Sequence, residues 1–421
     1  MAYDETTYRR PEDQGDDPAA YRTNGLTAPD YRGRRRDLDP EDGGGIRSDA
    51  TPVEPLRRTV RDDGGRDRLG IHIGWEIVLL LTVAAIGYLL YRLDPASLRR
   101  PALDGLLISG TVIGLLALGA GLTLRAGVPN LAIGPIALAA ALQYAENGDK
   151  GLAQAALPAI AIAAAGGVLV GLLVVSLHVP GWAATLAGAM GVVVFIQLRT
   201  HPVNVQGKYD PSNQAFYLFG GFALLAVVGG ALGTVPSVRR LLGRMRPTGD
   251  PADRRGTGAA LPVIGSLALS SVFAVVAGTL LAAQTTRAIV PKTGLEWTGL
   301  AFGIALLAGT SAFGRRGGIF GTLLASAGLA LFLDYADRRN FDIALFAIAA
   351  CTIGGGLVVT RLIETYGRPL SASGGDEDWN AAATTGTTAH WSPEMPESWT
   401  PSMPAQSRTD RWDEGPWGSA R

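Results

Sequence analysis

Few residues in this sequence have types and spacings that could support chemistry. The four histidines are His72, His178, His201 and His390, and none is spaced with Cys, Asp or Glu as a metal site requires. The single cysteine, Cys351, lies in an apolar run and can form no intramolecular disulfide. The sequence has no glycine-rich phosphate-binding loop ending in Lys-Ser or Lys-Thr. We therefore expect a chain that is not an enzyme, binds no metal or cofactor, and takes any ATP-derived energy from another subunit.

The segment GVPNLAIGP, residues 127 to 135, is the most unusual polar interruption of the apolar sequence. Pro129 and Asn130 come just before an otherwise apolar stretch, which also contains Gly134 and Pro135. Proline donates no backbone hydrogen bond and clashes with the preceding turn, so the helix must be broken here. Non-helical backbone at membrane depth is tolerated only where protein or a water-filled cavity surrounds it. The segment therefore predicts either a lining of a pathway, with the Asn130 amide as a polar contact, or a loop and helix cap at the membrane interface.

The elements that must position this segment are strongly apolar. The chain has 37 basic and 37 acidic residues, concentrated toward its two ends, and its balanced charge argues against nucleic acid as a partner. Long stretches between the ends contain no charged residue, and an unpaired charge at the bilayer centre costs about 2.5 to 3.5 kcal/mol. The middle of the chain is therefore expected to lie in a membrane.

The charge-free stretches predict an all-α membrane protein, a polytopic bundle of about ten transmembrane helices. The 48-residue stretch from Gly151 to Leu198 is long enough for two crossings, with the turn at His178, Pro180 and Gly181. The expected spans are residues 74–91, 105–124, 129–145, 153–177, 182–198, 216–235, 259–283, 297–313, 317–334 and 342–361. The spans 297–313 and 317–334 are short and could instead form one broken hairpin.

Basic residues predict that both ends of the chain are cytoplasmic (N-in/C-in). Five arginines, Arg57, Arg58, Arg61, Arg66 and Arg68, precede the first span, and the loop 236 to 258 falls on the same side. Residues 1–70 form a charged tail that lacks the apolar content to fold alone, and residues 366–421 form a second tail with five tryptophans, so both are expected to be disordered. The tryptophans could anchor a partner or the membrane surface, or could be tolerated without a fixed partner.

Three segments, in order, carry a resemblance to a known family. They are VPNLAIGP from Val128, VPGWAATLAG from Val179, and AGTSAFGRRGGIFGTLLAS from Ala308. Together they resemble the permease subunits of bacterial ABC importers of the ribose, xylose and branched-chain amino acid type. The third segment is the most specific, and the resemblance covers about residues 74 to 363, leaving out both tails.

This resemblance implies a permease in a bacterial plasma membrane that pairs with a second permease subunit, cytosolic ABC ATPase subunits and an extracytoplasmic solute-binding protein. The expected solute is a simple sugar; a nucleoside or a branched-chain amino acid is the alternative within the family. The implied pathway residues are Pro129, Asn130, Gly134, Thr185, Thr310 and Ser311. The threonines and serine could equally bond to their own helix backbone.

The sequence departs from the family where coupling to the ATPase is expected. The loop SVRRLLGRMRPTGDPADRRGTG lacks the usual docking pattern, although a short amphipathic helix could still present an ATPase-docking surface. The residues of that surface would be Arg239, Arg240, Leu241, Leu242, Arg244 and Met245. Arginines beside a membrane can instead contact anionic lipid. A divergent membrane scaffold without transport activity therefore stays as the second hypothesis.

Overall fold

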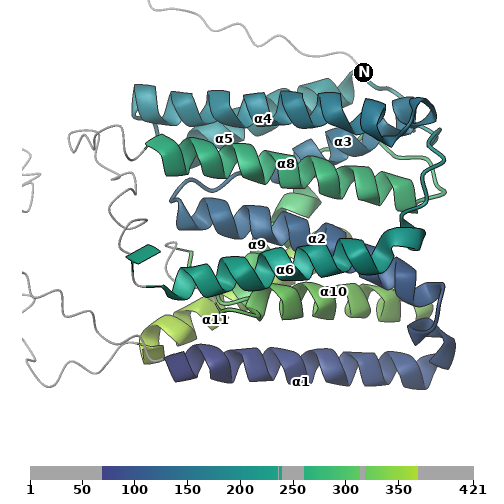
Figure 1. Ribbon diagram of the computed structural model, residues 1–421, viewed down its shortest axis with the longest axis vertical. Helices are drawn as coiled ribbons and strands as arrows, with labels where there is room; N and C mark the ends of the chain where they lie inside the picture. The colour runs from purple at the N-terminus through teal and green to yellow at the C-terminus, as the bar shows by residue number, and fades with distance from the viewer. Residues whose placement is uncertain (1–68, 236, 239–259, 313–317, 368–421) are drawn as a thin grey trace, which may run out of the picture. The chain divides into compact units, whose positions relative to one another are not determined.

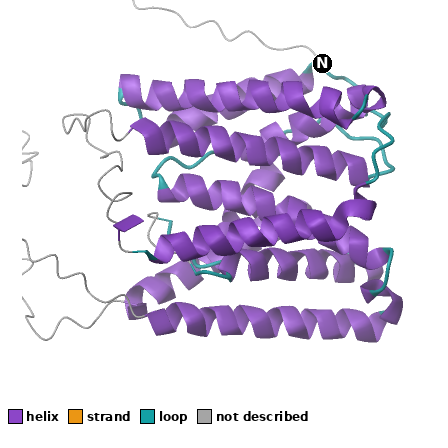
Figure 2. Ribbon diagram, in the orientation of Figure 1, coloured by secondary structure: helices purple, strands orange, loops and turns teal. Residues whose placement is uncertain are grey.

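The computed structural model describes residues 69–235, 237–238, 260–312 and 318–367, and these residues form helices and short connections with no strand (Figures 1 and 2). Their one β-type contact is an isolated antiparallel bridge between Val203 and Ile289. The expected docking residues 239 to 245 and nearly all of both expected tails lie outside the described residues. The helical content matches the expectation drawn from the charge-free stretches.

Ten helices of 13 or more residues lie in the described part of the chain, one in each range expected from the sequence. They are α1 (Leu69–Leu93), α2 (Ala102–Arg125), α3 (Ile133–Asn147), α4 (Leu152–Leu177), α5 (Gly181–Gln197), α6 (Ala215–Thr234), α8 (Ala260–Gln284), α9 (Leu295–Leu307), α10 (Gly321–Arg338) and α11 (Leu345–Gly367). Short 3-10 helices occupy Pro95–Leu98, Gly148–Lys150 and Pro211–Gln214. The end residues of α1 and α11 extend slightly into the expected tails.

Among the described helices, six are long and apolar enough to cross a membrane: α1, α2, α4, α6, α8 and α11. The remaining four are shorter or more polar. The shortest, α9, has 13 residues, which at 1.5 Å per residue span about 20 Å of a hydrocarbon core about 30 Å thick. Length and composition in the described residues thus support six crossings where the sequence predicted about ten.

Two helix ends differ from the expected boundaries for a local reason. The third helix begins at Ile133 rather than residue 129, and α9 ends at Leu307 rather than residue 313. Gly309 has a φ of 85°, its N–H bonds to the Leu306 carbonyl, and the Thr310 N–H bonds to the Ala305 carbonyl. This is the Schellman arrangement, in which a left-handed glycine closes the helix and satisfies its last carbonyl groups.

The helix α2 forms the centre of the bundle and packs against α6, α8, α9 and α10, while α4 covers α8 on one side (Figure 1). We call the end of the bundle where α1 begins and α11 ends the tail end, and the opposite end the far end. At the tail end the Trp75 indole donates to the Leu307 carbonyl, and the Glu76 carboxylate accepts from the Phe320 N–H at 2.7 Å. Glu76 is therefore buried at the N-terminus of α10, where the helix dipole favours a negative charge.

Small residues allow the central helices to approach closely. A Cβ on Gly278 of α8 would lie 1.9 Å from the Ala137 carbonyl oxygen of α3, and one on Gly114 of α2 would lie 2.2 Å from the Phe222 ring. Such contacts are the main source of helix association in lipid, where no hydrophobic effect draws apolar helices together. We call this tightly packed part, formed by α2 with α3, α6, α8 and α9, the packed core.

Candidate functional site: a cleft beside the broken helix

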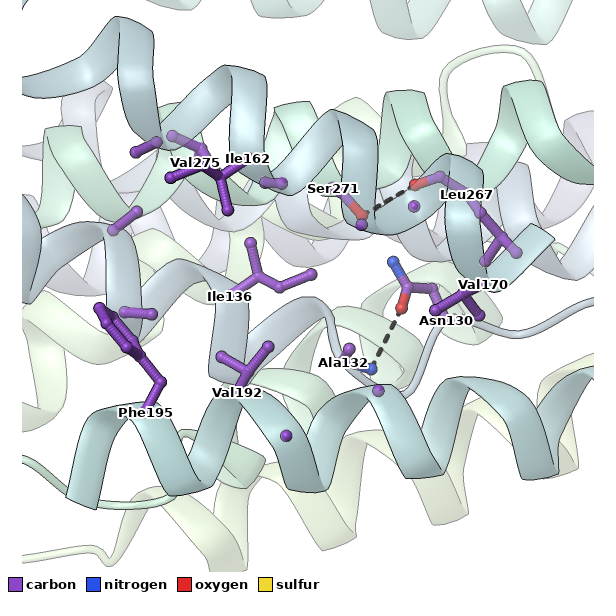
Figure 3. Close-up of a pocket in the computed structure, with 18 of the residues that line it drawn as sticks. Asn130, Ala132, Ile136, Ile162, Val170, Val192, Phe195, Leu267, Ser271 and Val275 are labelled. Carbon is purple, nitrogen blue, oxygen red and sulfur yellow. Dashed lines mark hydrogen bonds between the residues drawn. The ribbon is translucent and has the colours of Figure 1, made fainter. Parts of the chain in front are cut away.

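A cleft of about 400 Å³ lies between α3, α4, α5 and α8 (Figure 3). Most of its lining residues are glycine, alanine and larger aliphatic side chains. Four are uncharged polar residues: Asn130, Gln143, Thr185 and Ser271. Of the described residues that line it, none is Asp, Glu, Lys, Arg or His. The described lining is therefore uncharged and mostly apolar, which suits an uncharged solute.

Asn130 forms one end of the cleft and organises the broken segment. Asn130 is 3 % exposed, and its side-chain amide donates to the Ser270 hydroxyl at 3.1 Å. Its side-chain oxygen accepts from the Ala132 N–H at 3.1 Å (Figure 3). The Asn130 N–H in turn points to the Thr123 hydroxyl at 3.3 Å. These bonds replace the helical ones that the prolines interrupt, so the non-helical backbone is satisfied inside the protein as the membrane environment requires.

Thr185 of α5 binds the same broken segment from the other side of the cleft. Its hydroxyl donates to the Pro129 carbonyl at 2.7 Å and lies 3.2 Å from the Trp182 carbonyl of its own helix. Pro129, Asn130 and Thr185, which the sequence analysis nominated from two separate motifs, thus come together at one end of the cleft. The Thr185 hydroxyl makes both the contact across the site and the local backbone contact that we considered as an alternative.

The other three nominated residues lie elsewhere. Gly134 packs against the start of α9, where its N–H donates to the Thr298 hydroxyl at 3.1 Å and an added Cβ would lie 2.2 Å from the Gly294 carbonyl oxygen. Thr310 is buried in the turn that follows α9, and the Ser311 hydroxyl bonds to Glu364 of α11. None of the three lines the cleft. Gly134 contributes close packing, and Thr310 and Ser311 belong to the contact between α9 and α11 at the tail end.

The side of the cleft between α4 and α5 is open. Ile162 of α4 and Phe195 of α5 line the cleft and are nevertheless 73 % and 44 % exposed. Gly166 and Gly191 also line it, and a Cβ added to either would meet no atom within 4 Å. At these two positions glycine leaves space empty, whereas Gly167, which also lines the cleft, packs closely against Ala268 of α8, as the glycines of the packed core do against their neighbours.

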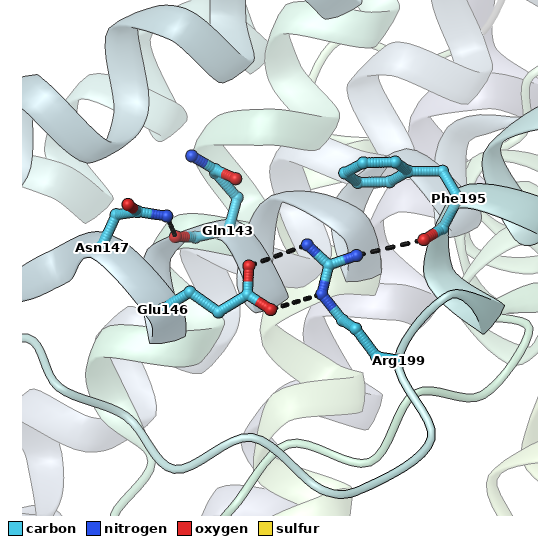
Figure 4. Close-up of polar contacts among 5 residues, drawn as sticks. All are labelled: Gln143, Glu146, Asn147, Phe195 and Arg199. Atoms are coloured by element: carbon cyan, nitrogen blue, oxygen red, sulfur yellow. Dashed lines mark hydrogen bonds and ion pairs between the residues drawn. The ribbon is translucent and has the colours of Figure 1, made fainter.

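An ion pair lies at the far end of the cleft (Figure 4). The Arg199 guanidinium, just after α5, binds the carboxylate of Glu146 in the last turn of α3 through two nitrogens, at 2.5 and 2.8 Å. A third nitrogen donates to the Phe195 carbonyl at 3.1 Å, and the guanidinium carbon lies 4.6 Å from the centroid of the Phe195 ring. The two-nitrogen geometry is the stronger form of a charge-assisted hydrogen bond.

Sequence reasoning did not nominate Gln143, Ser271, Phe195, Glu146 or Arg199. Gln143 and Ser271 are polar residues in apolar stretches, a signal no stronger than that of many structural residues. Glu146 and Arg199 had a usable signal: each is the first charged residue after a charge-free stretch, residues 126–145 and 151–198. Because α4 runs back between them, α3 and α5 run in the same direction, and their last turns meet at the same end of the bundle.

Comparison with known proteins adds no relative, since no family model, curated protein or solved structure matches the chain. Within the described residues, no group of three His, Cys, Asp or Glu side chains could hold a metal ion. The site is therefore defined by its own geometry: an uncharged, mostly apolar cleft, with a polar cluster around Asn130 at one end and an ion pair at the other.

Proposed function

We propose that this chain is the permease subunit of an ATP-driven ABC importer in a bacterial plasma membrane, and that the cleft is its part of the translocation pathway. One observation carries the proposal. The two motifs that suggested a pathway, VPNLAIGP and VPGWAATLAG, meet through the bond from Thr185 to the Pro129 carbonyl and border the same cleft. Pathway residues of transporters typically lie at broken helices inside the bundle, where non-helical backbone can face a cavity.

Ten crossings with both ends in the cytoplasm belong to this proposal. The start of α1 and the end of α11 lie at the same end of the bundle (Figure 1), as an even number of crossings requires. The short helices α3 and α9 are each continued by a non-helical segment, around Asn130 and Thr310, that adds to their reach. In this orientation the tail end is cytoplasmic and the far end is extracytoplasmic.

The energy for transport would come from separate cytosolic ATPase subunits, which close on ATP and rock a pair of permeases between inward-open and outward-open states. An extracytoplasmic binding protein would deliver the solute at the far end. The absence of charged groups among the described cleft residues favours an uncharged solute, a simple sugar first and a nucleoside second. A zwitterionic amino acid would leave its charges without partners in this cleft, which is unfavourable.

A pull-down from gentle detergent tests the proposal. The tagged chain is purified, associated proteins are identified by mass spectrometry, and the experiment is repeated with Leu241, Leu242 and Met245 changed to Ser. A control changes Leu370, Met395 and Met403, three apolar residues outside the loop, to Ser. We expect an ABC ATPase to co-purify with the parent and the control, and to be lost from the loop variant.

The absence of any ATPase, under conditions that preserve a known importer complex, would contradict the proposal and favour the membrane scaffold. Retention of the ATPase by the loop variant would contradict the docking surface alone.

A further inference from the structure

We propose that the Glu146–Arg199 ion pair is a latch that holds the far end of the cleft closed, and that its opening exposes the cleft to the extracytoplasmic side. The latch consists of Glu146, Arg199 and the Phe195 ring on which the guanidinium stacks. The assignment of the far end as extracytoplasmic rests on the proposed function. The existence of a closable end of the cleft rests on the geometry alone.

The pair connects the two helices that border the cleft on one side. Glu146 lies in the last turn of α3, and Arg199 follows the end of α5 by two residues. Near the tail end, α5 is bound to the segment before α3 by the Thr185–Pro129 hydrogen bond. The two elements are thus joined on both sides of the cleft, by a neutral bond at one end and by an ionic one at the other.

The ion pair is in direct register with the cleft lining. Gln143 precedes Glu146 by three residues and lies one turn back on the same face of α3. Phe195 lies in the last turn of α5, and its ring stacks on the guanidinium of Arg199 just beyond that turn. Both Gln143 and Phe195 line the cleft. Figure 4 shows the Phe195 ring beside the guanidinium of Arg199. Separation of Glu146 from Arg199 would let the end of α5, with Phe195, move away from the end of α3 and uncover the Gln143 side of the cleft.

The exposure of the pair suits repeated opening. The Arg199 side chain is 15 % exposed and that of Glu146 is 33 % exposed, so water can reach both groups once they separate. A fully buried ion pair is costly to break because it leaves unsolvated charges, whereas a partly exposed pair can be broken at a smaller cost. The pair can thus fix the closed geometry without preventing the change of state that alternating access needs.

Thiol accessibility tests the latch without a solute or an ATPase. In a Cys351→Ser background, Gln143→Cys serves as the reporter. Its rate of modification by a membrane-impermeant, positively charged methanethiosulfonate is measured from outside in intact cells. Glu146→Gln and Arg199→Gln each remove one charge of the latch, and the double change Glu146→Arg with Arg199→Glu restores an ion pair in reverse. Arg338→Gln is the matched control, because it removes an ion pair with Asp94 and Asp334 at the same end of the bundle, outside the cleft.

We expect each single change to raise the modification rate at least about tenfold, which corresponds to about 1.4 kcal/mol in the opening equilibrium. The charge reversal should bring the rate back toward that of the parent, and Arg338→Gln should leave it unchanged. If Glu146→Gln does not accumulate as folded protein, Glu146→Asp replaces it, since it keeps the charge but withdraws the carboxylate by one methylene.

An ion pair that only stabilises the fold, and does not control opening of the cleft, would give a different result. Rates within twofold of the parent in both single variants would overturn the latch, as would an equal acceleration in Arg338→Gln, which would indicate general loosening. The outcome is independent of the pull-down. A chain with no ATPase partner can still show a latch, and a permease with its ATPase can still lack one.

Discussion

The packed core around α2 and the cleft wall of α4 and α5 have similar compositions but very different environments. In α2, 67 % of the most apolar window is buried in the bundle, whereas in α4 the share is 17 %. Both regions are rich in glycine and alanine. In the core, Gly114 and Gly278 are contact points between helices, while Gly166 and Gly191 face open space. Small residues therefore mark two opposite situations, close approach of helices and open space beside the cleft, which only the structure separates.

The largest effect is expected from a methyl group added at a core glycine. In Gly278→Ala, the new Cβ would meet the Ala137 carbonyl oxygen, and both partners are backbone, so α3 and α8 must move apart. We expect a loss of about 3 kcal/mol in the free energy of unfolding, at the upper end of overpacking effects. Gly191→Ala in the cleft should cost nothing. Thermal unfolding of the purified variants in detergent measures the difference, and equal midpoints would break the comparison between core and cleft.

A smaller effect is expected at the junction of the two regions. Asn130→Ala removes the partners of the Ser270 hydroxyl and the Ala132 N–H, both buried. Groups left unsatisfied in this way cost about 2 kcal/mol. Gln143→Ala, in the same cleft but partly exposed, is the control and should change the unfolding midpoint little. An unchanged unfolding midpoint in Asn130→Ala would show that water replaces the side-chain amide as the partner of the Ser270 hydroxyl and the Ala132 N–H.

The bond between α5 and the broken segment should contribute less. Thr185→Val keeps the shape of the side chain and removes the hydrogen bond to the Pro129 carbonyl, for an expected cost of about 1 kcal/mol. The matched change Thr82→Val removes an exposed hydroxyl that bonds only within its own helix, and should have no effect. Similar unfolding midpoints for the two variants would indicate that the Thr185 hydroxyl serves its own helix, as threonines in membrane helices often do.

The sequence predicts where the helices lie, but not where they end or which helices pack together. The ten helices lie in the expected ranges because the absence of charge over a long stretch is visible in one dimension. The helix ends at Leu307 and Ile133 were missed because they depend on local hydrogen bonds, those of Gly309 and of the Asn130 side chain. The broken backbone pointed to Asn130, which lines the cleft, whereas Thr310 and Ser311 lie away from it, because the sequence does not reveal that α9 packs on α11.

The smallest effect is expected in the loop that connects the cleft wall to α6. The Asp210 carboxylate accepts from the Ser212 N–H at 2.9 Å, and hydrogen bonds from Ser212 hold the pKa of Asp210 below its usual value. A lowered pKa in the folded state means that this carboxylate stabilises the fold above its unfolded pKa, and that the contribution is lost as pH falls through the folded pKa. Asp210→Asn should therefore lose less stability than the parent between pH 5 and pH 3. If the free energy of unfolding fell equally with pH in the parent and in Asp210→Asn, the stabilising role of the Asp210 carboxylate would be contradicted.

Blocking the cleft tests the central claim most directly. Cells that produce the chain with its ATPase are given labelled ribose, xylose, adenosine or leucine, and uptake is compared between Gly191→Trp, which fills the cleft, and Gly220→Trp, which adds the same side chain to an open face of α6 outside the cleft. We predict ATP-dependent uptake of ribose, xylose or adenosine, which is lost in Gly191→Trp and kept in Gly220→Trp. Equal uptake by the two variants would show that the cleft is not the pathway, and no uptake above that of cells lacking the chain would contradict the importer itself.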